Sequence, residues 1–354
     1  MTDERRQGGP RMEDVARAAG VATSTVSRAL ADPGRVNEAT RARIIAAASE
    51  LGYTLNAAAR NLRTRSSRVI MVVLPGSRFH IGASQVVPEV TRALDAALLE
   101  HNYGLLMGNF DRSDSADRRI IDLAYGGAVD GVILLAVSAP VANGRSLRDC
   151  GLPLVSVFFD ERADGISSVV TNDREATREA VRHLLALGHR RFFYISAPSD
   201  NYHEVERYAG VCEELKAAGL GADAVVRFAG AFDFDSGIAG ARHYLSLERR
   251  PTAVICCNDN MAVSFMKVVS DGGLKVPQDL SVVGFDGAEL GAFCGPGLTT
   301  IRQPTAKMGR VAAARLLKLI SQRSSQAVSR KRKPDIHVED STLVIRGSTG
   351  PAPR

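Results

Sequence analysis

From Val69 onward, short apolar runs alternate with amphipathic stretches, and this alternation restricts the possible folds more than any other feature of the sequence. The first run, VIMVVLP, is continuously apolar, as expected for a strand buried on both faces of a parallel sheet. About ten strand and helix units follow one another in roughly 250 residues. Repeated units of this kind predict a doubly wound α/β architecture with parallel sheets.

So many units do not fit one compact sheet, and the body is expected to form two similar subdomains with a cleft between them. We assign residues 69–171 and 299–330 to the first subdomain, and residues 172–298 and 331–354 to the second. The stretch HVEDSTLVIRGST predicts a single last strand. The predicted helices of the body lie at residues 86–100, 115–126, 174–187, 205–218, 235–247, 261–272 and 305–320.

The N-terminal stretch DVARAAGVATSTVSRAL predicts two short helices joined by a tight turn at Gly20. Val15, Ala16 and Ala19 are spaced to bury one face of the first helix. The second helix has an apolar face of the same kind, formed by Val26, Ala29 and Leu30. The pattern is that of a helix-turn-helix, whose second helix lies in the DNA major groove. Taken alone, it also fits any small helical hairpin.

A third helix is predicted after this motif. Asn37 can cap it, Glu38 suits its first turn, and Gly52 ends it in a left-handed conformation. Its apolar face is expected to consist of Ile44, Ile45, Ala48 and Leu51.

A short basic helix is predicted next, with Asn56 as its N-cap and Leu62 near its end. At about two turns it is marginal in isolation, so it would fold only against a partner. The chain is therefore expected to divide into a disordered tail, a helix-turn-helix head, a hinge helix with linker, and a core, at residues 1–10, 11–53, 54–68 and 69–354.

Most of the excess positive charge lies on the head and the hinge. The chain carries a net charge of +6, and residues 1–68 alone hold 12 Arg and no Lys against 7 Asp and Glu. A basic module attached to a nearly neutral body is typical of a nucleic-acid-binding protein. The alternative is a basic terminus that is merely solvated.

The sequence argues against several other classes. No apolar run approaches the roughly 20 residues of a membrane span, and the charged N-terminus does not resemble a secretory signal. The 5 cysteines contain no CxxC pair, so disulfides and a zinc site are not expected and a reducing cytoplasm fits best. There is no P-loop, no GxSxG, no GxGxxG after a strand and no metal-ligand cluster, so we expect neither an enzyme nor a cofactor. A transport-type solute-binding protein would share the two subdomains, but it would have a signal peptide and no head.

The quoted motifs resemble those of the LacI-type transcriptional regulators. MEDVARAAGVATSTVSRAL and VNEATRARIIAAASELGYTLNAAARNL are similar to the family's DNA-binding head and hinge. VDGVIL, LGHRR, ERYAG, PTAVICCNDNMA, LSVVGFD, LTTIRQP and LVIRGST follow in family order and spacing. The resemblance covers about residues 11–350 and is specific because the whole ordered set is present.

For DNA recognition, the resemblance implies base contacts by Thr23, Ser24 and Arg28 of the second helix. Hydroxyl groups can donate to or accept from either base type, and an Arg can pair with guanine O6 and N7. Further candidates for phosphate or base-edge contacts are Thr25, Ser27, Arg35, Asn37 and Thr40. The alternative for Thr23 is a helix cap, because Ala22 stands where the family often has a capping Ser.

The hinge is similar to the family's minor-groove helix. Leu62 matches the leucine that wedges into the central base step, and Ala58 and Ala59 permit close approach of two such helices. The alternative for Leu62 is the core of a continuous helix. Leu55 replaces the usual Pro before the capping Asn56, which leaves the start of the hinge less rigid.

For the cleft, the resemblance implies effector contacts by Arg207 in ERYAG, Asn258 in CCND, Asp286 in GFD, and Phe232 as a stacking aromatic residue. An Arg, an amide, a carboxylate and an aromatic wall form a usual set for a sugar or another small polar ring. Further candidates for effector contact are Phe79, Phe158 and Phe159, which follow predicted strands. Asn201 and His203, shortly before Arg207, are candidates as well.

Some of these assignments have structural alternatives. Phe158 and Phe159 also fit a core, and Asp286 also fits a turn cap. Where family members often have a carboxylate at the boundary of strand and loop, this chain has Phe158, Phe159 and then Asp160, so the effector's identity does not transfer from a relative.

The expected function is that of a cytoplasmic, nucleoid-associated bacterial transcription regulator, most simply a repressor. It would bind near-palindromic double-stranded operator DNA as a homodimer, without contact to a membrane. A small polar effector in the cleft would control its operator affinity.

Overall fold

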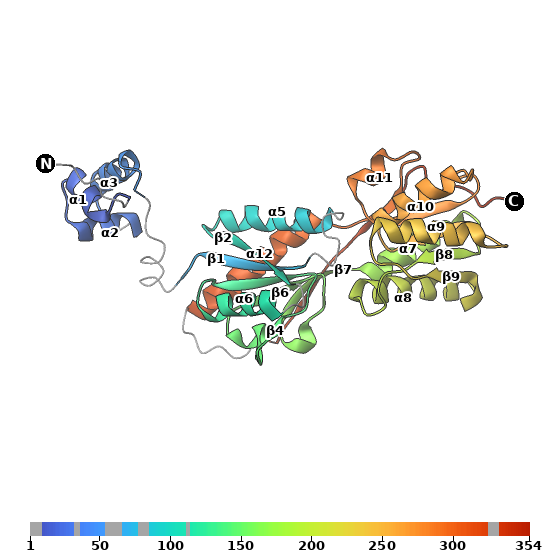
Figure 1. The fold of residues 1–354 in the computed structure, drawn as a ribbon, viewed down its shortest axis with the longest axis horizontal. Helices are drawn as coiled ribbons and strands as arrows, with labels where there is room; N and C mark the ends of the chain where they lie inside the picture. The colour runs from blue at the N-terminus through green and yellow to red at the C-terminus, as the bar shows by residue number, and fades with distance from the viewer. Residues whose placement is uncertain (1–8, 32–35, 54–65, 77–84, 111–113, 325–332) are drawn as a thin grey trace. The chain divides into compact units, whose positions relative to one another are not determined.

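The computed structural model describes residues 9–31, 36–53, 66–76, 85–110, 114–324 and 333–354. The chain forms two units, Met1–Arg68 and Val69–Arg354, which we call the head unit and the core unit (Figure 1). Five predicted site residues lie outside the described residues, namely Arg35, Asn56, Ala59, Leu62 and Phe79.

Three helices make up the described part of the head unit, namely α1 (Met12–Ala18), α2 (Thr23–Ala31) and α3 (Glu38–Glu50). Val15 of α1, Val26 of α2 and Ile44 of α3 are fully buried in one small core. Gly20 links α1 to α2 with φ +61°, a left-handed conformation that glycine adopts without strain. The predicted helical hairpin is confirmed.

The predicted apolar face of α3 is partly wrong. Ile44 and Ala48 are buried as expected, but Ile45 is 45% exposed and Leu51 is 38% exposed. Ala47 is buried instead. Consecutive residues of an α-helix are about 100° apart around the axis, so burial of Ile44 turns Ile45 toward solvent.

The first sheet of the core unit has the order β13-β7-β6-β3-β1-β2, and every pair in it is parallel. Its strands are β1 (Val69–Pro75), β2 (Gly104–Phe110), β3 (Gly131–Leu135), β6 (Leu154–Val157), β7 (Ser167–Thr171) and β13 (Ile336–Glu339). Its helices are α5 (Val86–Leu99), α6 (Asp114–Tyr125) and α12 (Thr305–Ser324). Alternate residues of β1 face opposite layers: Ile70 and Val72 pack with α5 and α12, whereas Met71 and Val73 pack with α6. We call this sheet with its helices the first lobe (Figure 1).

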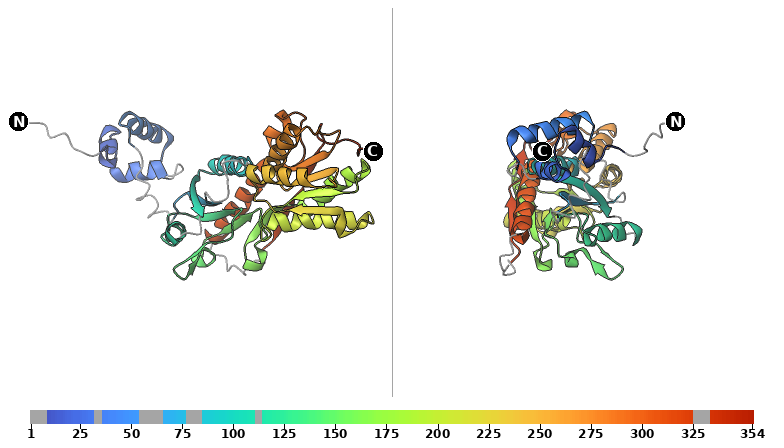
Figure 2. Two further views of the ribbon diagram at one scale, coloured as in Figure 1. Left: turned by 45° about the vertical axis from the view of Figure 1, so that its right-hand side comes forward. Right: turned by 90° about the vertical axis from the view of Figure 1, so that its left-hand side faces the viewer.

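The second sheet has the order β14-β12-β11-β10-β8-β9, and only β14 runs antiparallel to its neighbour. Its strands are β8 (Phe192–Ile195), β9 (Val225–Phe228), β10 (Ala253–Cys256), β11 (Ser281–Asp286), β12 (Thr299–Arg302) and β14 (Thr342–Val344). Its helices are α7 (Asp173–Ala186), α8 (Tyr202–Ala217), α9 (Phe234–Ser246), α10 (Asp259–Asp271) and α11 (Glu289–Phe293). Helix α7 packs on α8, and α9 packs on α10. This second lobe follows the first along the core unit (Figures 1 and 2).

The predicted division between the two lobes is wrong at two strands. β12, assigned from sequence to the first half, pairs with β11 in the second sheet. β13, assigned to the second half, pairs with β7 in the first sheet. The single strand predicted over HVEDSTLVIRGST is two strands in different sheets, separated by Asp340 and Ser341. A strand belongs to the sheet in which its ladder is completed, and the sequence alone does not show where the chain crosses between sheets.

Several small elements were not predicted, including three short 3-10 helices at Leu147–Cys150, Arg162–Asp164 and Ala222–Ala224. A hairpin joins β4 (Val141–Ala142) to β5 (Arg145–Ser146), and the short helix α11 follows β11. Within the described parts of the chain, no helix is both long enough and apolar enough to cross a membrane.

A fully buried histidine holds the C-terminal segment against the second sheet. His189 is 0% exposed, and its Nε2 lies 3.1 Å from the Gly350 carbonyl oxygen, which can only accept a hydrogen bond. Nε2 also lies 2.9 Å from Ser281 Oγ, and Nδ1 lies 2.8 Å from Thr252 Oγ1. These three contacts hold the ring in place, and burial lowers the pKa of His189 from its ordinary value of 6.5.

This histidine should make the stability of the core unit sensitive to acid. The folded protein holds His189 neutral, so the unfolded state binds the proton more readily, and stability is lost as pH falls below about 6.5. We expect the slope from this one group to reach at most about 1.4 kcal/mol per pH unit. Urea unfolding at several pH values should show a shallower dependence for His189→Gln than for the wild type. His101→Gln serves as the control, because His101 is exposed. If the free energy of unfolding depends equally on pH in all three proteins, His189 is not the source of the acid sensitivity.

Candidate functional site

The second helix of the head presents two hydroxyls and one guanidinium to solvent. Thr23, Ser24 and Arg28 are all exposed on α2. Arg28 lies one turn after Ser24, and its Nε donates to the Ser24 carbonyl oxygen at 3.3 Å. Ser24 and Arg28 therefore occupy one face of the helix, as the base-reading prediction requires.

The start of α2 is not capped by a threonine side chain. The Ala22 carbonyl oxygen accepts from the amides of Thr25 and Val26, so Ala22 occupies the N-cap position and Thr23 is the first helical residue. Thr23 is therefore not the N-cap residue of α2, and the capping alternative is wrong. Asn37 does cap α3, because its side chain accepts from the Ala39 amide at 2.9 Å, and it remains exposed.

In the core unit, backbone strain gathers where strands end. Ala136 after β3, Phe158 after β6 and Asp286 at the end of β11 have φ angles of +55°, +78° and +125°. Phe232, in the loop after β9, has φ +64°. Positive φ is uncommon in residues with a side chain, and such strain concentrates at binding and active sites. The four positions point to the carboxyl ends of the sheets, where open α/β sheets bind ligands.

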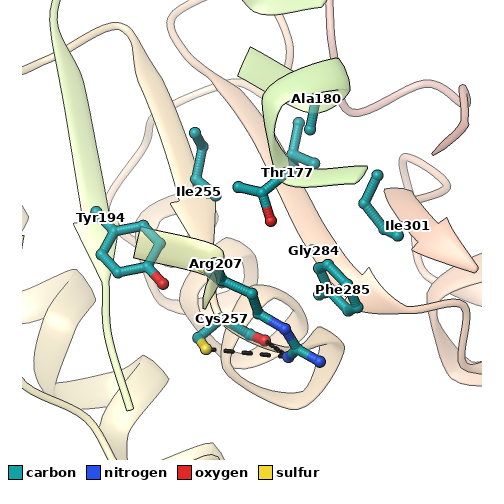
Figure 3. Close-up of a pocket in the computed structure, with 11 residues that line it drawn as sticks. Thr177, Ala180, Tyr194, Arg207, Ile255, Cys257, Gly284, Phe285 and Ile301 are labelled. Atoms are coloured by element: carbon teal, nitrogen blue, oxygen red, sulfur yellow. Dashed lines mark hydrogen bonds between the residues drawn. The ribbon is translucent and has the colours of Figure 1, made fainter. Parts of the chain in front are cut away.

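Arg207 of α8 is a buried charged residue at this end of the second sheet. Its side chain is 3% exposed, its Nε donates to Asp173 Oδ2 at 2.8 Å, and its Nη1 donates to the Cys257 carbonyl oxygen at 2.5 Å (Figure 3). The guanidinium carbon lies 3.5 Å from the centre of the Phe285 ring. Asp173 raises the pKa of Arg207 even though burial alone would lower it, so the group is a fixed cation.

Asp173, the first residue of α7, organises the groups around Arg207. It is 1% exposed and accepts hydrogen bonds from Thr171 Oγ1, from His203 Nδ1 at 2.8 Å and from Arg207 Nε. Burial alone would raise the pKa of Asp173, but Arg207 and His203 outweigh burial and hold it well below its usual range. Asp173 is therefore a buried, ionised carboxylate, and it was not among the predicted site residues.

Aromatic rings meet at the junction of the two lobes. The His203 ring lies 5.6 Å from the Phe158 ring and 5.8 Å from the Phe159 ring, centre to centre. Phe158 is 2% exposed and belongs to the core of the first lobe, whereas Phe159 is half-buried. The Asn201 side chain accepts from the His203 amide at 2.9 Å and thereby caps α8. The junction thus brings Phe159, Asn201, His203 and Arg207 into one neighbourhood, and Phe158 fits its core alternative.

Two carboxyl groups lie at the end of β11. Asp286 is half-buried, and its Oδ1 accepts from Gln303 Nε2 at 2.7 Å. Asp259 is 1% exposed and accepts from Thr300 Oγ1 at 2.6 Å and from the Ala288 amide at 2.7 Å. Burial and the neighbouring Asp286 raise the pKa of Asp259. Burial also raises the pKa of Asp286, against the opposing effect of Arg207.

Asn258 holds the loop that carries Phe232. It is 2% exposed, its Oδ1 accepts from the Met261 amide at 3.0 Å, and its Nδ2 donates to the Phe232 carbonyl oxygen at 2.8 Å. The side chain therefore caps α10 and fixes the strained, half-buried Phe232 at the same time. Both of its polar groups are in use, so its direct contact with an effector remains a prediction.

Sequence reasoning missed three of these residues, namely Asp173, Asp259 and Gln303. Asp173 and Asp259 each follow an Asn at the start of a helix, and an acidic residue in the first turn is also a normal helix-dipole feature. A small cavity beside α7 is lined by Arg207, Tyr194, Cys257 and Phe285 among others (Figure 3). Of the predicted effector residues that the structure describes, Arg207 alone lines it. Among the described side chains, no group of three His, Cys, Asp or Glu is placed to hold a metal ion.

Comparison with known families gives two matches along the chain. Residues 11–56 match the family described as "Bacterial regulatory proteins, lacI family". Residues 181–349 match the family described as "Periplasmic binding protein-like domain".

Several full-length relatives are similar to the chain. The HTH-type transcriptional repressor CytR of Escherichia coli (strain K12) is 32% identical over 354 residues, which is all of both chains. The HTH-type transcriptional regulator CelR of Thermobifida fusca is 32% identical over 330 residues, 92% of this chain and 96% of its own.

Solved structures agree in fold. The lac repressor dimer bound to operator and the anti-inducer ONPF has a TM-score of 0.81 at 26% identity and covers 97% of this chain and 100% of its own. The complex of the transcriptional regulator CelR with cellobiose has a TM-score of 0.71 at 29% identity and covers 96% of this chain and 99% of its own.

Proposed function

Because this chain belongs to the lacI family of bacterial regulatory proteins, we propose that it binds near-palindromic operator DNA as a homodimer and represses transcription until a small polar effector binds the core. A sugar or sugar derivative fits best, since the relative named CelR is described in complex with cellobiose. The protein acts as a DNA-binding regulator and not as an enzyme, on the nucleoid in the cytoplasm.

The observation that carries this proposal is the buried cluster around Arg207, joined in one chain to a helix-turn-helix head. The cluster combines a fixed cation, a buried carboxylate and an adjacent aromatic ring at the carboxyl end of a sheet. Such preorganised polar groups beside strained backbone support ligand binding rather than stability alone.

On the DNA side, Thr23, Ser24 and Arg28 read base edges in the proposal. Phosphate or base-edge contacts come from Thr25, Arg35 and Asn37, and the hinge contacts come from Asn56, Ala59 and Leu62. Exposure of the three α2 side chains supports the first group. Residues 35, 56, 59 and 62 are proposed on the family resemblance alone.

On the effector side, Arg207 and Asp286 hold the polar groups of the ligand, and Phe232 stacks on its ring. At the junction of the lobes, the ligand is contacted by Phe159, Asn201 and His203. Asn258, which is bonded to Phe232, contacts it as well. Phe79 is included on resemblance alone. Asp286 and Gln303 lie beside the crossing from β12 to α12, and Asp173 lies beside the crossing from β7 to α7. Ligand contact with these groups would therefore shift the lobes, which supports coupling to the head.

The proposal is tested by mapping the DNA that the protein binds across the genome of its source, followed by footprinting. We expect the bound DNA to contain a near-palindromic site. A thermal-shift panel of sugars and sugar derivatives should identify a ligand that weakens or strengthens the complex of protein and operator. Binding without sequence preference, or identical operator affinity with and without every stabilising ligand, would contradict it.

Arg28→Ala should weaken operator binding by about 10- to 100-fold and relax preference at one position of each half-site, because a bidentate contact with guanine is worth about 1–3 kcal/mol. Quantitative gel shifts against single-base operator variants measure both effects. Arg28→Lys is the matched control, since it keeps the charge and loses the fork. Arg28→Lys should retain the salt dependence of operator binding but lose the base preference at that position. An unchanged base preference in Arg28→Ala would show that another residue reads that base.

A further inference from the structure

The guanidinium of Arg207 has little hydrogen-bonding capacity left for a ligand. Nε is engaged by Asp173, and Nη1 is engaged by the Cys257 carbonyl oxygen. One face of the group is covered by the Phe285 ring (Figure 3). Nη2 has no hydrogen-bond partner among the described residues. An Arg binds a carboxylate or phosphate best through two parallel N–H groups, either on Nε and Nη2 or on Nη1 and Nη2. In Arg207, Nε and Nη1 are already in use, so neither pair is free.

The charge of Arg207 is also neutralised within its own lobe. Asp173 on α7 and Arg207 on α8 both belong to the second lobe, so their pairing does not depend on how the lobes are arranged. The side chain of Asp173 is 0% exposed and that of Arg207 is 3% exposed, so water screens the pair very little. Tight pairing in such surroundings leaves almost no net positive charge to attract an anion.

Two of the other groups around Arg207, the Asp286 carboxyl and the Cys257 carbonyl, add negative charge. Asp286 acts on Arg207 electrostatically, and the Cys257 carbonyl directs its negative end at the guanidinium. His203 is bonded through Nδ1 to the same Asp173 oxygen. An incoming phosphate or carboxylate would therefore meet two carboxyl groups around a single cation that is already paired.

We propose that Asp173 sets the charge selectivity of the effector site, so that Arg207 Nη2 donates only to an uncharged oxygen, such as a hydroxyl or carbonyl, and the ligand carries no anionic group at that end. This inference rests on the proposed effector site. It narrows the effector to neutral polar compounds at this position and excludes phosphate esters and sugar acids whose anionic group would face Arg207.

The test compares the wild type with Asp173→Asn and with the double variant Asp173→Asn/Arg207→Gln, using inorganic phosphate as the probe. Asp173→Asn keeps the side-chain volume but removes the carboxylate that is paired directly with Arg207. At constant ionic strength, phosphate in the millimolar range should raise the Tm of Asp173→Asn by at least about 2 °C more than it raises that of the wild type. The double variant should respond like the wild type, because it lacks the cation.

Phosphate also stabilises proteins by exclusion from their surface, so a variant of an exposed pair measures that background. Asp271→Asn serves here, since Asp271 pairs with Lys267 on the surface of α10 and both side chains are more than half exposed. A wild-type response as large as that of Asp173→Asn would overturn the proposal, because Arg207 would then bind anions with Asp173 in place. A response of Asp173→Asn no larger than that of the double variant would overturn it as well.

If Asp173→Asn does not fold, the wild type is compared with the double variant alone. Equal phosphate responses support the proposal, and a larger wild-type response that disappears with Arg207 contradicts it. None of these measurements uses DNA, so failure of the charge selectivity is distinguishable from failure of the proposed regulatory function.

Discussion

Arg207→Ala is expected to abolish the effector response and to lower the free energy of unfolding of the core unit by about 3–5 kcal/mol. The substitution leaves Asp173 buried without its main counter-charge and removes the donor to the Cys257 carbonyl oxygen. It also uncovers the face of Phe285. Urea unfolding measures the stability, and operator binding with and without the ligand selected in the thermal-shift panel measures the response.

Two controls separate the loss of function from the loss of stability. Asp173→Asn/Arg207→Gln replaces the ion pair with neutral groups of similar size, so it should regain most of the stability and still fail to respond. Arg190→Ala removes an exposed Arg of the same lobe that bonds to the Leu185 carbonyl oxygen, and it should behave like the wild type. A full effector response in Arg207→Ala would remove this residue from the site.

Gly237→Ala should destabilise the core unit by about 2–3 kcal/mol, despite the better helix propensity of alanine. Gly237 lies in α9 where this helix crosses α10, and a Cβ atom there would overlap Ser264 Oγ and the Met261 carbonyl oxygen and would lie 2.8 Å from Met261 Cα. Two of these atoms belong to the backbone of α10 and cannot turn aside. Urea unfolding followed by circular dichroism measures the change.

Gly240→Ala is the matched comparison, because it lies about one turn further along the same helix. A Cβ atom there would approach Ile195 Cδ1 at 2.7 Å, which is the end of a flexible side chain that can rotate. We expect a smaller loss of stability than for Gly237→Ala. Equal losses would mean that helix crossing is not what requires glycine at position 237.

Local patterns in the sequence predicted most of the secondary structure. Continuous apolar runs marked buried parallel strands, and helix bounds agreed closely, as for α7, predicted at 174–187 and found at Asp173–Ala186. These features depend on residues a few positions apart, so they can be recognised in the sequence itself. The exposed Ile45 shows the limit, because periodicity alone did not fix which side of α3 faces the core.

The partners of Arg207 could not be predicted in the same way. ERYAG singled out Arg207 through its family resemblance, but its buried counter-charge, Asp173, lies 34 positions earlier on another helix. For Asn258, the resemblance implied a ligand contact, but it did not show that the two polar groups cap α10 and hold Phe232. Which bonds a polar side chain makes depends on the groups that packing places around it.

The sequence by itself determined the family, the order of the elements and the residue types at the ends of the strands, because these are properties of local pattern and motif. The tertiary structure decided that β12 and β13 exchange lobes, that Arg207 is a paired rather than a free cation, and that strain gathers at Phe232 and Asp286. The physical reason is that sheet pairing, burial and charge compensation are contacts between segments far apart in the chain. Only the folded chain brings those segments together.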